Sequence, residues 1–254
     1  MLTPIGWPAD MPELFPSPTS KVFVIGHNKT GTTSMEALLR SLDYRLGDQV
    51  AGELLLDDWA DGRFDRIVDL CRTADAFQDI PFSLWGTYRV LDLEFPGSKF
   101  VLTVRDSATQ WYESVCRWGR KLVNAQGPLP TAEEMRAFTY RAPGWFLRSH
   151  LLIYGVGEDE LYQRDRYIRA YEAHIAAVEE YFAGRPDALL VLNLADPASL
   201  GRLCDFLGVD PAPGMTMPHL NEASAVLEQV DAPVGEAPSV PDASPRRRRS
   251  LLGR

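Results

Sequence analysis

The chain has 254 residues, of which 45% are hydrophobic and 24% charged, the balance of an ordinary globular protein. Its net charge of −9 excludes sequence-independent binding to nucleic acid, which requires clustered lysine and arginine side chains. Three widely spaced cysteines predict reduced thiols, and the absence of a signal peptide or a long apolar run predicts a cytoplasmic protein with no membrane span.

Short apolar runs alternate with segments whose apolar residues recur at helical spacing. This alternation predicts an α/β fold with a doubly wound parallel sheet of about five strands. The first unit is a strand, a glycine-containing loop and a helix, as in a P-loop. We expect strands at residues 21–26, 44–46, 74–80, 99–104 and 188–192. We expect further helices at residues 57–72, 84–95, 108–123 and 197–207, the last ending at Gly208.

The composition also predicts how the chain is organised. Residues 1–20 read as an irregular lead-in, and residues 21–221 as one α/β domain. Residues 124–185 form a helical insertion, with its longest helix at 158–182, that we expect both to cap the sheet and to extend the core. Residues 222–254 are rich in proline and alanine and end in a run of arginines, which predicts a solvated tail; the alternative is a binding segment for an acidic partner.

The loop at residues 26–33, with the sequence GHNKTGTT, carries the strongest chemical signal. A glycine-bounded turn between a strand and a helix presents backbone N–H groups and the positive end of the helix dipole to an anion. Lys29 adds a full positive charge, and Thr32 and Thr33 add hydroxyl donors. The alternative interpretation of Lys29 is a solvated loop lysine.

This loop differs from the nucleoside triphosphatase loop GxxxxGK[ST], because Thr32 follows the second glycine and the lysine precedes it. The fourth predicted strand ends in Arg105 and Asp106, without a lone aspartate suited to holding Mg²⁺ through water. We therefore expect direct binding of an anion, with no metal.

Several segments together resemble the sulfotransferases that use 3′-phosphoadenosine 5′-phosphosulfate (PAPS). KTGTTS is similar to their 5′-phosphosulfate loop, and VLTVRDSATQWYESV is similar to their second motif, a strand, an arginine and a helix. The wider pattern, a D-x-P segment before FPGSKFVLTVRD and PHLN near residue 221, resembles the compact branch of that family. The resemblance covers most of the chain, from about residue 21 to residue 221.

The resemblance implies a role for each matching residue. Lys29 would stabilise the leaving phosphate, and Arg105 would hold the 3′-phosphate of the donor. Ser114 would share that role, although the family's serine position is occupied here by Glu113. The 5′-phosphate would be bound by the remaining loop residues, Asn28, Thr30, Gly31, Thr32 and Thr33.

A general base must take the proton of the acceptor. Asp79 is our first choice, because it ends the third predicted strand and lies in a Q-D-I-P segment that resembles the family's; the alternative is an aspartate that binds backbone groups before Pro81. His27 and His219 are further candidates, each with a structural role as its alternative. Three tryptophans are candidates for an acceptor pocket: Trp85, Trp118 and Trp145.

The sequence thus predicts a sulfotransferase that moves a sulfuryl group from PAPS to a small-molecule acceptor. The alternatives are a small-molecule kinase that uses ATP and Mg²⁺, and a non-catalytic nucleotide-binding protein. The absence of GK[ST] argues against the kinase, and the presence of Lys29 and Arg105 argues against the non-catalytic protein. The sequence leaves the monomer and the homodimer both open.

Overall fold

The computed structural model describes residues 20–124 and 127–218. The predicted lead-in up to residue 19, the predicted tail, His219 and the terminal arginine run lie outside the described residues. The boundaries proposed for those segments therefore remain predictions.

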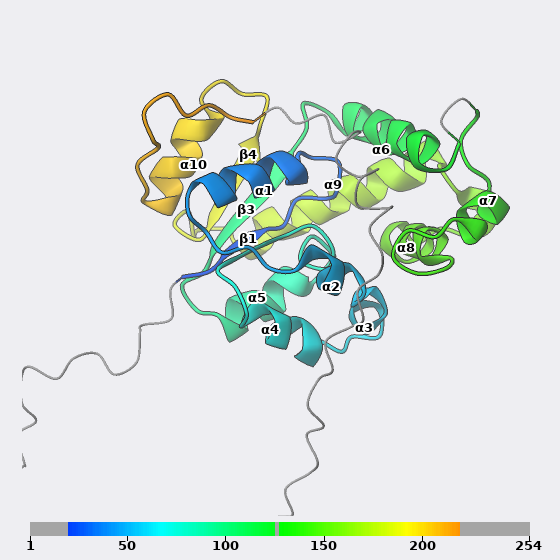
Figure 1. Ribbon diagram of the computed structural model, residues 1–254, viewed down its shortest axis with the longest axis horizontal. Coiled ribbons are helices and arrows are strands. Elements are labelled where there is room, and N and C mark those ends of the chain that lie inside the picture. The colour runs from blue at the N-terminus through cyan, green and yellow to red at the C-terminus, as the bar shows by residue number, and fades with distance from the viewer. Residues whose placement is uncertain (1–19, 125–126, 219–254) are drawn as a thin grey trace, which may run out of the picture.

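The centre of the described chain is a parallel sheet, as predicted (Figure 1). Its four strands are β1 (Val22–Val24), β2 (Ala76–Gln78), β3 (Lys99–Val104) and β4 (Leu189–Asn193). They lie in the order β2-β1-β3-β4, so the chain reverses direction across the sheet between β2 and β3. β3 has the bounds expected from the sequence, β4 begins and ends one residue later than predicted, and β1 and β2 are shorter than predicted.

The predicted strand at residues 44–46 is wrong, and the sheet has four strands in the described chain instead of about five. Only a single bridge, between Leu46 and Ala76, forms there. The segment is too tightly held at both ends to pair further. The Tyr44 N–H donates to Leu39 at the end of one helix, and Asp48 already caps the next.

Helices cover both faces of the sheet. Side chains alternate along each strand, so each strand contributes apolar residues to both faces. Phe23, Phe77 and Phe100 pack against α4 (Asp65–Cys71), α5 (Thr87–Glu94) and the far end of α9 (Arg164–Tyr181). Val22, Val24 and Val101 pack on the other face against α1 (Thr32–Ser41) and α10 (Ser199–Leu207). The fold is therefore the doubly wound α/β architecture predicted from the sequence.

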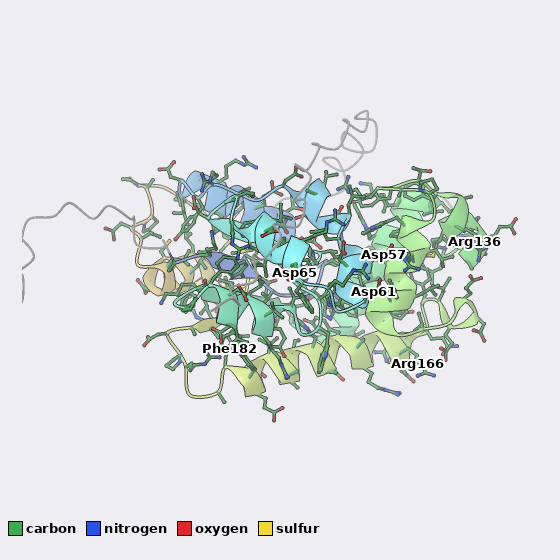
Figure 2. All side chains as sticks on the ribbon, turned by 90° about the horizontal axis from the view of Figure 1, so that it is seen from below. Asp57, Asp61, Asp65, Arg136, Arg166 and Phe182 are labelled. Atoms are coloured by element: carbon green, nitrogen blue, oxygen red, sulfur yellow. The ribbon has the colours of Figure 1, made fainter. Side chains whose placement is uncertain are left out.

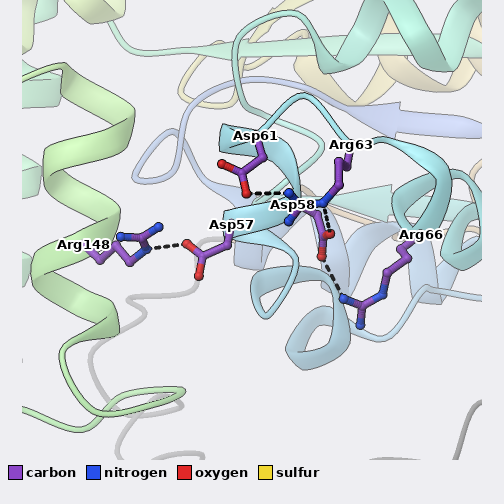
Figure 3. Close-up of polar contacts among 6 residues, drawn as sticks. All are labelled: Asp57, Asp58, Asp61, Arg63, Arg66 and Arg148. Carbon is purple, nitrogen blue, oxygen red and sulfur yellow. Dashed lines mark hydrogen bonds and ion pairs between the residues drawn. The ribbon is translucent and has the colours of Figure 1, made fainter.

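The helix predicted at residues 57–72 is two helices, α3 (Leu56–Ala60) and α4. The break falls at Gly62, whose φ of 70° is in the left-handed region that ends a helix. Asp58 stabilises the turn by pairing with Arg63 and Arg66 (Figure 3). A short helix that the sequence did not predict, α2 (Gln49–Glu53), precedes this pair.

Most of the chain between β3 and β4 is helical. It contains α6 (Ala108–Val123), with the predicted bounds, then α7 (Ala132–Ala137), α8 (Trp145–Tyr154), the 3-10 turn η1 (Glu158–Glu160) and α9. These helices enclose an aromatic core of their own, centred on Trp111, Tyr154 and Tyr167. α9 joins this core to the sheet, as Figure 2 shows by the positions of Arg166 and Phe182 near its two ends.

Helix α8 and the segment before it contact α2 and α3. Arg148 of α8 pairs with Asp57 of α3 on the surface (Figure 3). In the interior, Arg141 pairs with Glu53, and the indole of Trp145 donates to the Glu53 carbonyl at 3.1 Å. These contacts fix the inserted helices beside the carboxyl ends of β1 and β2.

Candidate functional site

A cavity of about 310 Å³ lies at the carboxyl ends of β1 and β2. The residues that follow these strands form its floor, and α1, α2, α6 and α8 provide its walls. In open α/β sheets, ligands bind outside the carboxyl ends of the strands, where the strand order reverses. The position of the cavity is therefore that of a ligand site.

The loop between β1 and α1 approaches β3 so closely that its first position requires glycine. A Cβ on Gly26 would lie 2.2 Å from Thr103 Oγ1. Thr103 also supports the loop from below, because its hydroxyl lies 2.6 Å from that of Thr30, which in turn donates to the His27 carbonyl. The Thr30 side chain is thus buried and braces the loop. It does not line the cavity.

The second glycine of the loop, Gly31, has a φ of 102° and precedes the first turn of α1. No side chain caps this helix, and its N-terminal end lies beside the cavity. Thr32 and Thr33, in that turn, line the cavity. The arrangement is that of an anion cradle.

Lys29 lies in this loop with its ammonium 3.9 Å from the centre of the Trp118 ring of α6. Its backbone has a φ of 70°, which is strained for a residue with a side chain. Burial lowers the pKa of the Lys29 ammonium to about 7, an effect that the Asp79 carboxylate opposes and neighbouring cations reinforce. A bound anion would favour the charged form.

Arg105 follows β3 and is half-buried. Its Nε donates to the Lys29 carbonyl at 2.8 Å, and its backbone N–H donates to the Tyr171 hydroxyl oxygen at 3.1 Å. Burial, more than any neighbouring charge, lowers the pKa of its guanidinium. Arg105 therefore holds the turn that carries Lys29. The hydrogen bond from Nε also limits the positions that its two terminal nitrogens can take.

Asp79 lies directly after β2 and lines the cavity. Its Oδ2 accepts a hydrogen bond from the Thr32 hydroxyl at 3.0 Å, and its Oδ1 accepts from the Ile80 N–H at 2.9 Å. Its φ of 61° is again in the left-handed region. Burial raises the pKa of this carboxyl, while the hydrogen bonds from Thr32 and Ile80 and the charge of Lys29 act in the opposite direction.

The ring of His27 lies outside the cavity wall. It packs among Trp111, Tyr171 and His174, with 4.6 Å between the centres of the two imidazole rings. Burial and the neighbouring His174 hold its pKa well below the usual range, so the ring is neutral. This position fits a structural role beneath the loop, not contact with a reacting group.

Asn28 lines the cavity and is held from two sides. The indole of Trp111 donates to its backbone carbonyl at 3.0 Å, and the Tyr154 hydroxyl donates to its Oδ1 at 3.3 Å. Its side-chain NH₂ group is the donor that it can offer to a ligand.

Ser114 is half-buried on α6, one turn before Trp118, whereas Glu113 is exposed. Residues three or four positions apart share a helix face, so Ser114 lies on the side of α6 that approaches the loop. Arg117 and Lys121 belong to the same side and contribute positive potential at Lys29. Arg117 and Lys121 thus give the loop a cationic environment near Lys29.

A buried polar network forms the cavity wall away from the loop, and the sequence analysis missed it. Glu53 of α2 pairs with Arg141 and accepts from Gln49, which in turn accepts from Gln78 at the end of β2. Only Gln49 and Glu53 are related by helical spacing, and α2, the end of β2 and the segment before α8 meet only in the folded chain. Among the predicted tryptophans, Trp118 and Trp145 line the cavity, whereas Trp85 is 54% exposed and does not.

Two further observations concern residues 20–124 and 127–218. Within them, no helix is both long and apolar enough to cross a membrane, and no three histidine, cysteine or acidic side chains are grouped as metal ligands.

The chain matches one model of a known protein family. A family model described as a sulfotransferase domain matches residues 21–226, which include the loop, the cavity and all four strands. No curated protein sequence matches the chain at a significant level.

Proposed function

We propose, from the premise that this chain belongs to the family of sulfotransferase domains, that its cavity transfers the sulfuryl group of PAPS to a hydroxyl or amine of a small-molecule acceptor. The observation that carries the proposal is the convergence of Lys29 and Asp79 on one cavity, beside an anion cradle. Both residues have strained backbones, and such strain is concentrated at functional sites.

In the proposed reaction, the acceptor oxygen attacks the sulfur in line with the bond from sulfur to the bridging oxygen of PAPS. As the new S–O bond forms, the old one breaks, and its electron pair stays on the 5′-phosphate of the product. The Lys29 ammonium and the N-terminal end of α1 would stabilise this charge. Asp79 would accept the proton that the acceptor loses, at a pKa that burial has already raised.

The donor would lie along the loop. Asn28, Gly31, Thr32 and Thr33 would bind its 5′-phosphate, and Thr30 would support them from below; Asn28, Thr32 and Thr33 line the cavity. Arg105 and Ser114 would bind the 3′-phosphate at the other end of the loop, within the positive potential of α6. His27 has no direct part in this assignment because it does not line the cavity.

Isothermal titration calorimetry with 3′-phosphoadenosine 5′-phosphate (PAP), the desulfated product of PAPS, tests the donor site. We expect saturable binding of PAP and much weaker binding of ATP with Mg²⁺. Saturation by ATP with Mg²⁺ but not by PAP would instead support the kinase. Binding of PAP without any turnover of PAPS in the presence of a broad acceptor mixture would support the non-catalytic protein.

The cytoplasmic location and the choice between monomer and homodimer stay predictions from the sequence. We propose a diffusible acceptor because the cavity is small, at about 310 Å³, and is bounded by aromatic side chains such as Trp118 and Trp145.

A further inference from the structure

Three hydrogen bonds of the cavity wall form a chain that ends at Gln78. Gln78 Nε2 donates to Gln49 Oε1 at 3.0 Å, and Gln49 Nε2 donates to Glu53 Oε1 at 3.2 Å. The other oxygen of Glu53 accepts from Arg141. All four residues line the cavity.

The direction of this chain is fixed at Glu53. Arginine can only donate, and an ionised carboxylate can only accept. The NH₂ group of Gln49 must therefore face Glu53, which turns its carbonyl oxygen toward Gln78. For the same reason the NH₂ group of Gln78 faces Gln49. The orientation of both amides thus follows from chemistry, independently of how their oxygen and nitrogen atoms are assigned.

In this series of hydrogen bonds, the carbonyl oxygen of Gln78 is left without a donor. Gln78 is 7% exposed, and its Oε1 is buried without a hydrogen-bond partner among the described residues. A buried acceptor without a partner is unfavourable, and native structures rarely keep one without a reason. Only a hydrogen-bond donor can satisfy it.

The neighbours of Gln78 indicate what would carry that donor. Gln78 and Asp79 line the same cavity, so an acceptor there can contact Gln78 with one group while Asp79 deprotonates another. The α8 side of the wall carries three aromatic side chains, Trp145, Phe146 and Tyr154. Aromatic walls of this kind favour a planar apolar ligand.

We propose that Gln78 is a specificity-determining residue whose carbonyl oxygen accepts a hydrogen bond from a second hydroxyl or amino group of the acceptor. The acceptor class is a planar aromatic molecule with two such donors, one of which receives the sulfuryl group. This inference rests on the proposed sulfotransferase function.

The test compares matched small probes in the presence of saturating PAP. The probes are the three dihydroxybenzenes and their monomethyl ethers, which differ by the loss of one donor. Their dissociation constants are measured by ligand-observed NMR titration under argon at pH 8. Burial raises the pKa of Glu53 to about 7, so at pH 8 its carboxylate is charged and orients the chain.

In the wild type, we expect at least one dihydroxybenzene to bind about tenfold more tightly than its ether, which corresponds to ~1.4 kcal/mol. Gln78→Met keeps the length of the side chain but removes the acceptor, and it should abolish the difference by weakening only the diol. Gln49→Met should reduce the difference while leaving Gln78 in place. Val50→Ala, at an apolar position of the same wall, should retain it.

The inference is overturned if no dihydroxybenzene binds more tightly than its ether in the wild type, a comparison that needs no variant. It is also overturned if Gln78→Met retains the full difference, which would indicate exclusion of the methyl group by shape. The dissociation constant of PAP is measured for every protein. It distinguishes failure of the Gln78 inference from failure of the proposed sulfotransferase function. Loss of PAP binding in the wild type refutes the proposed function, whereas normal PAP binding without a diol preference refutes only the role of Gln78.

Discussion

The hydroxyl of Thr32 donates to Asp79 Oδ2 at 3.0 Å and thereby links the first turn of α1 to the end of β2. One residue of the anion cradle thus contacts the proposed general base directly. Because this hydrogen bond lowers the pKa of Asp79, the two halves of the proposed reaction are electrostatically connected.

Thr32→Val removes the hydroxyl and preserves the shape of the side chain. Without this donor, the pKa of Asp79 should rise further, since burial already raises it. A base must be deprotonated to act, so the acidic limb of the kcat profile should move to higher pH. The measurement is kcat against pH for the variant and for Thr32→Ser, which keeps the hydroxyl and should retain the wild-type limb. An acidic limb that is the same in all three proteins would exclude Asp79 as the titrating base.

Lys29 should control the basic limb. The pKa of its ammonium is about 7 in the free protein, and only the charged form attracts the donor. We therefore expect kcat/KM for PAPS to fall as the pH rises through about 7. Lys29→Arg should lose this limb, because a guanidinium stays charged, whereas Lys29→Ala should lower kcat roughly 10²- to 10³-fold. Wild-type turnover in Lys29→Ala, with the fold intact by circular dichroism, would remove Lys29 from the mechanism.

Arg105 has two separable roles. Its Nε holds the Lys29 carbonyl at 2.8 Å, and its terminal nitrogens are proposed to bind the 3′-phosphate. Adenosine 5′-phosphosulfate, which lacks that phosphate, distinguishes them. If Arg105 binds the 3′-phosphate, Arg105→Ala should weaken the binding of PAPS roughly 10- to 100-fold more than the binding of the analogue. Equal losses for both nucleotides, measured by calorimetry, would show that Arg105 acts only by holding the loop.

The sequence predicted those parts of the fold that local patterns determine. β3 and α6 have the bounds expected from an unbroken apolar run and from helical spacing. Residues 44–46 also look like a strand, but the hydrogen bond from Tyr44 to the end of α1 competes with pairing, and local propensity does not reveal such competition.

The same distinction applies to the site. The loop from Gly26 to Thr33 is a contiguous motif, so the sequence located the candidates on it. His27 illustrates the limit, because membership in the motif could not show that its ring turns into the aromatic core. Glu53 and Arg141 were missed altogether, since they are far apart in the chain and become partners only when the inserted helices dock beside α2.

The ion pair between Glu53 and Arg141 should matter for stability because it is buried, with side chains 7% and 5% exposed. Removing one partner leaves the other charge unpaired in the interior, so Glu53→Leu should destabilise the protein by about 3–5 kcal/mol. Glu53→Leu/Arg141→Leu removes both charges and should cost much less than the sum of the two single variants. Urea denaturation of the four proteins measures this coupling, and additive losses would contradict it.

The pH dependence gives a second readout of the same pair. Burial raises the folded-state pKa of Glu53 to about 7, above its ordinary value of 4.5. The stabilisation from this carboxyl is therefore fully present below pH 4.5 and is lost as the pH rises through about 7. The double leucine variant has no such group, so its stability relative to the wild type should increase between pH 5 and pH 8. A relative stability that does not change over this range would mean that Arg141 keeps Glu53 ionised throughout, with its folded-state pKa near the ordinary value.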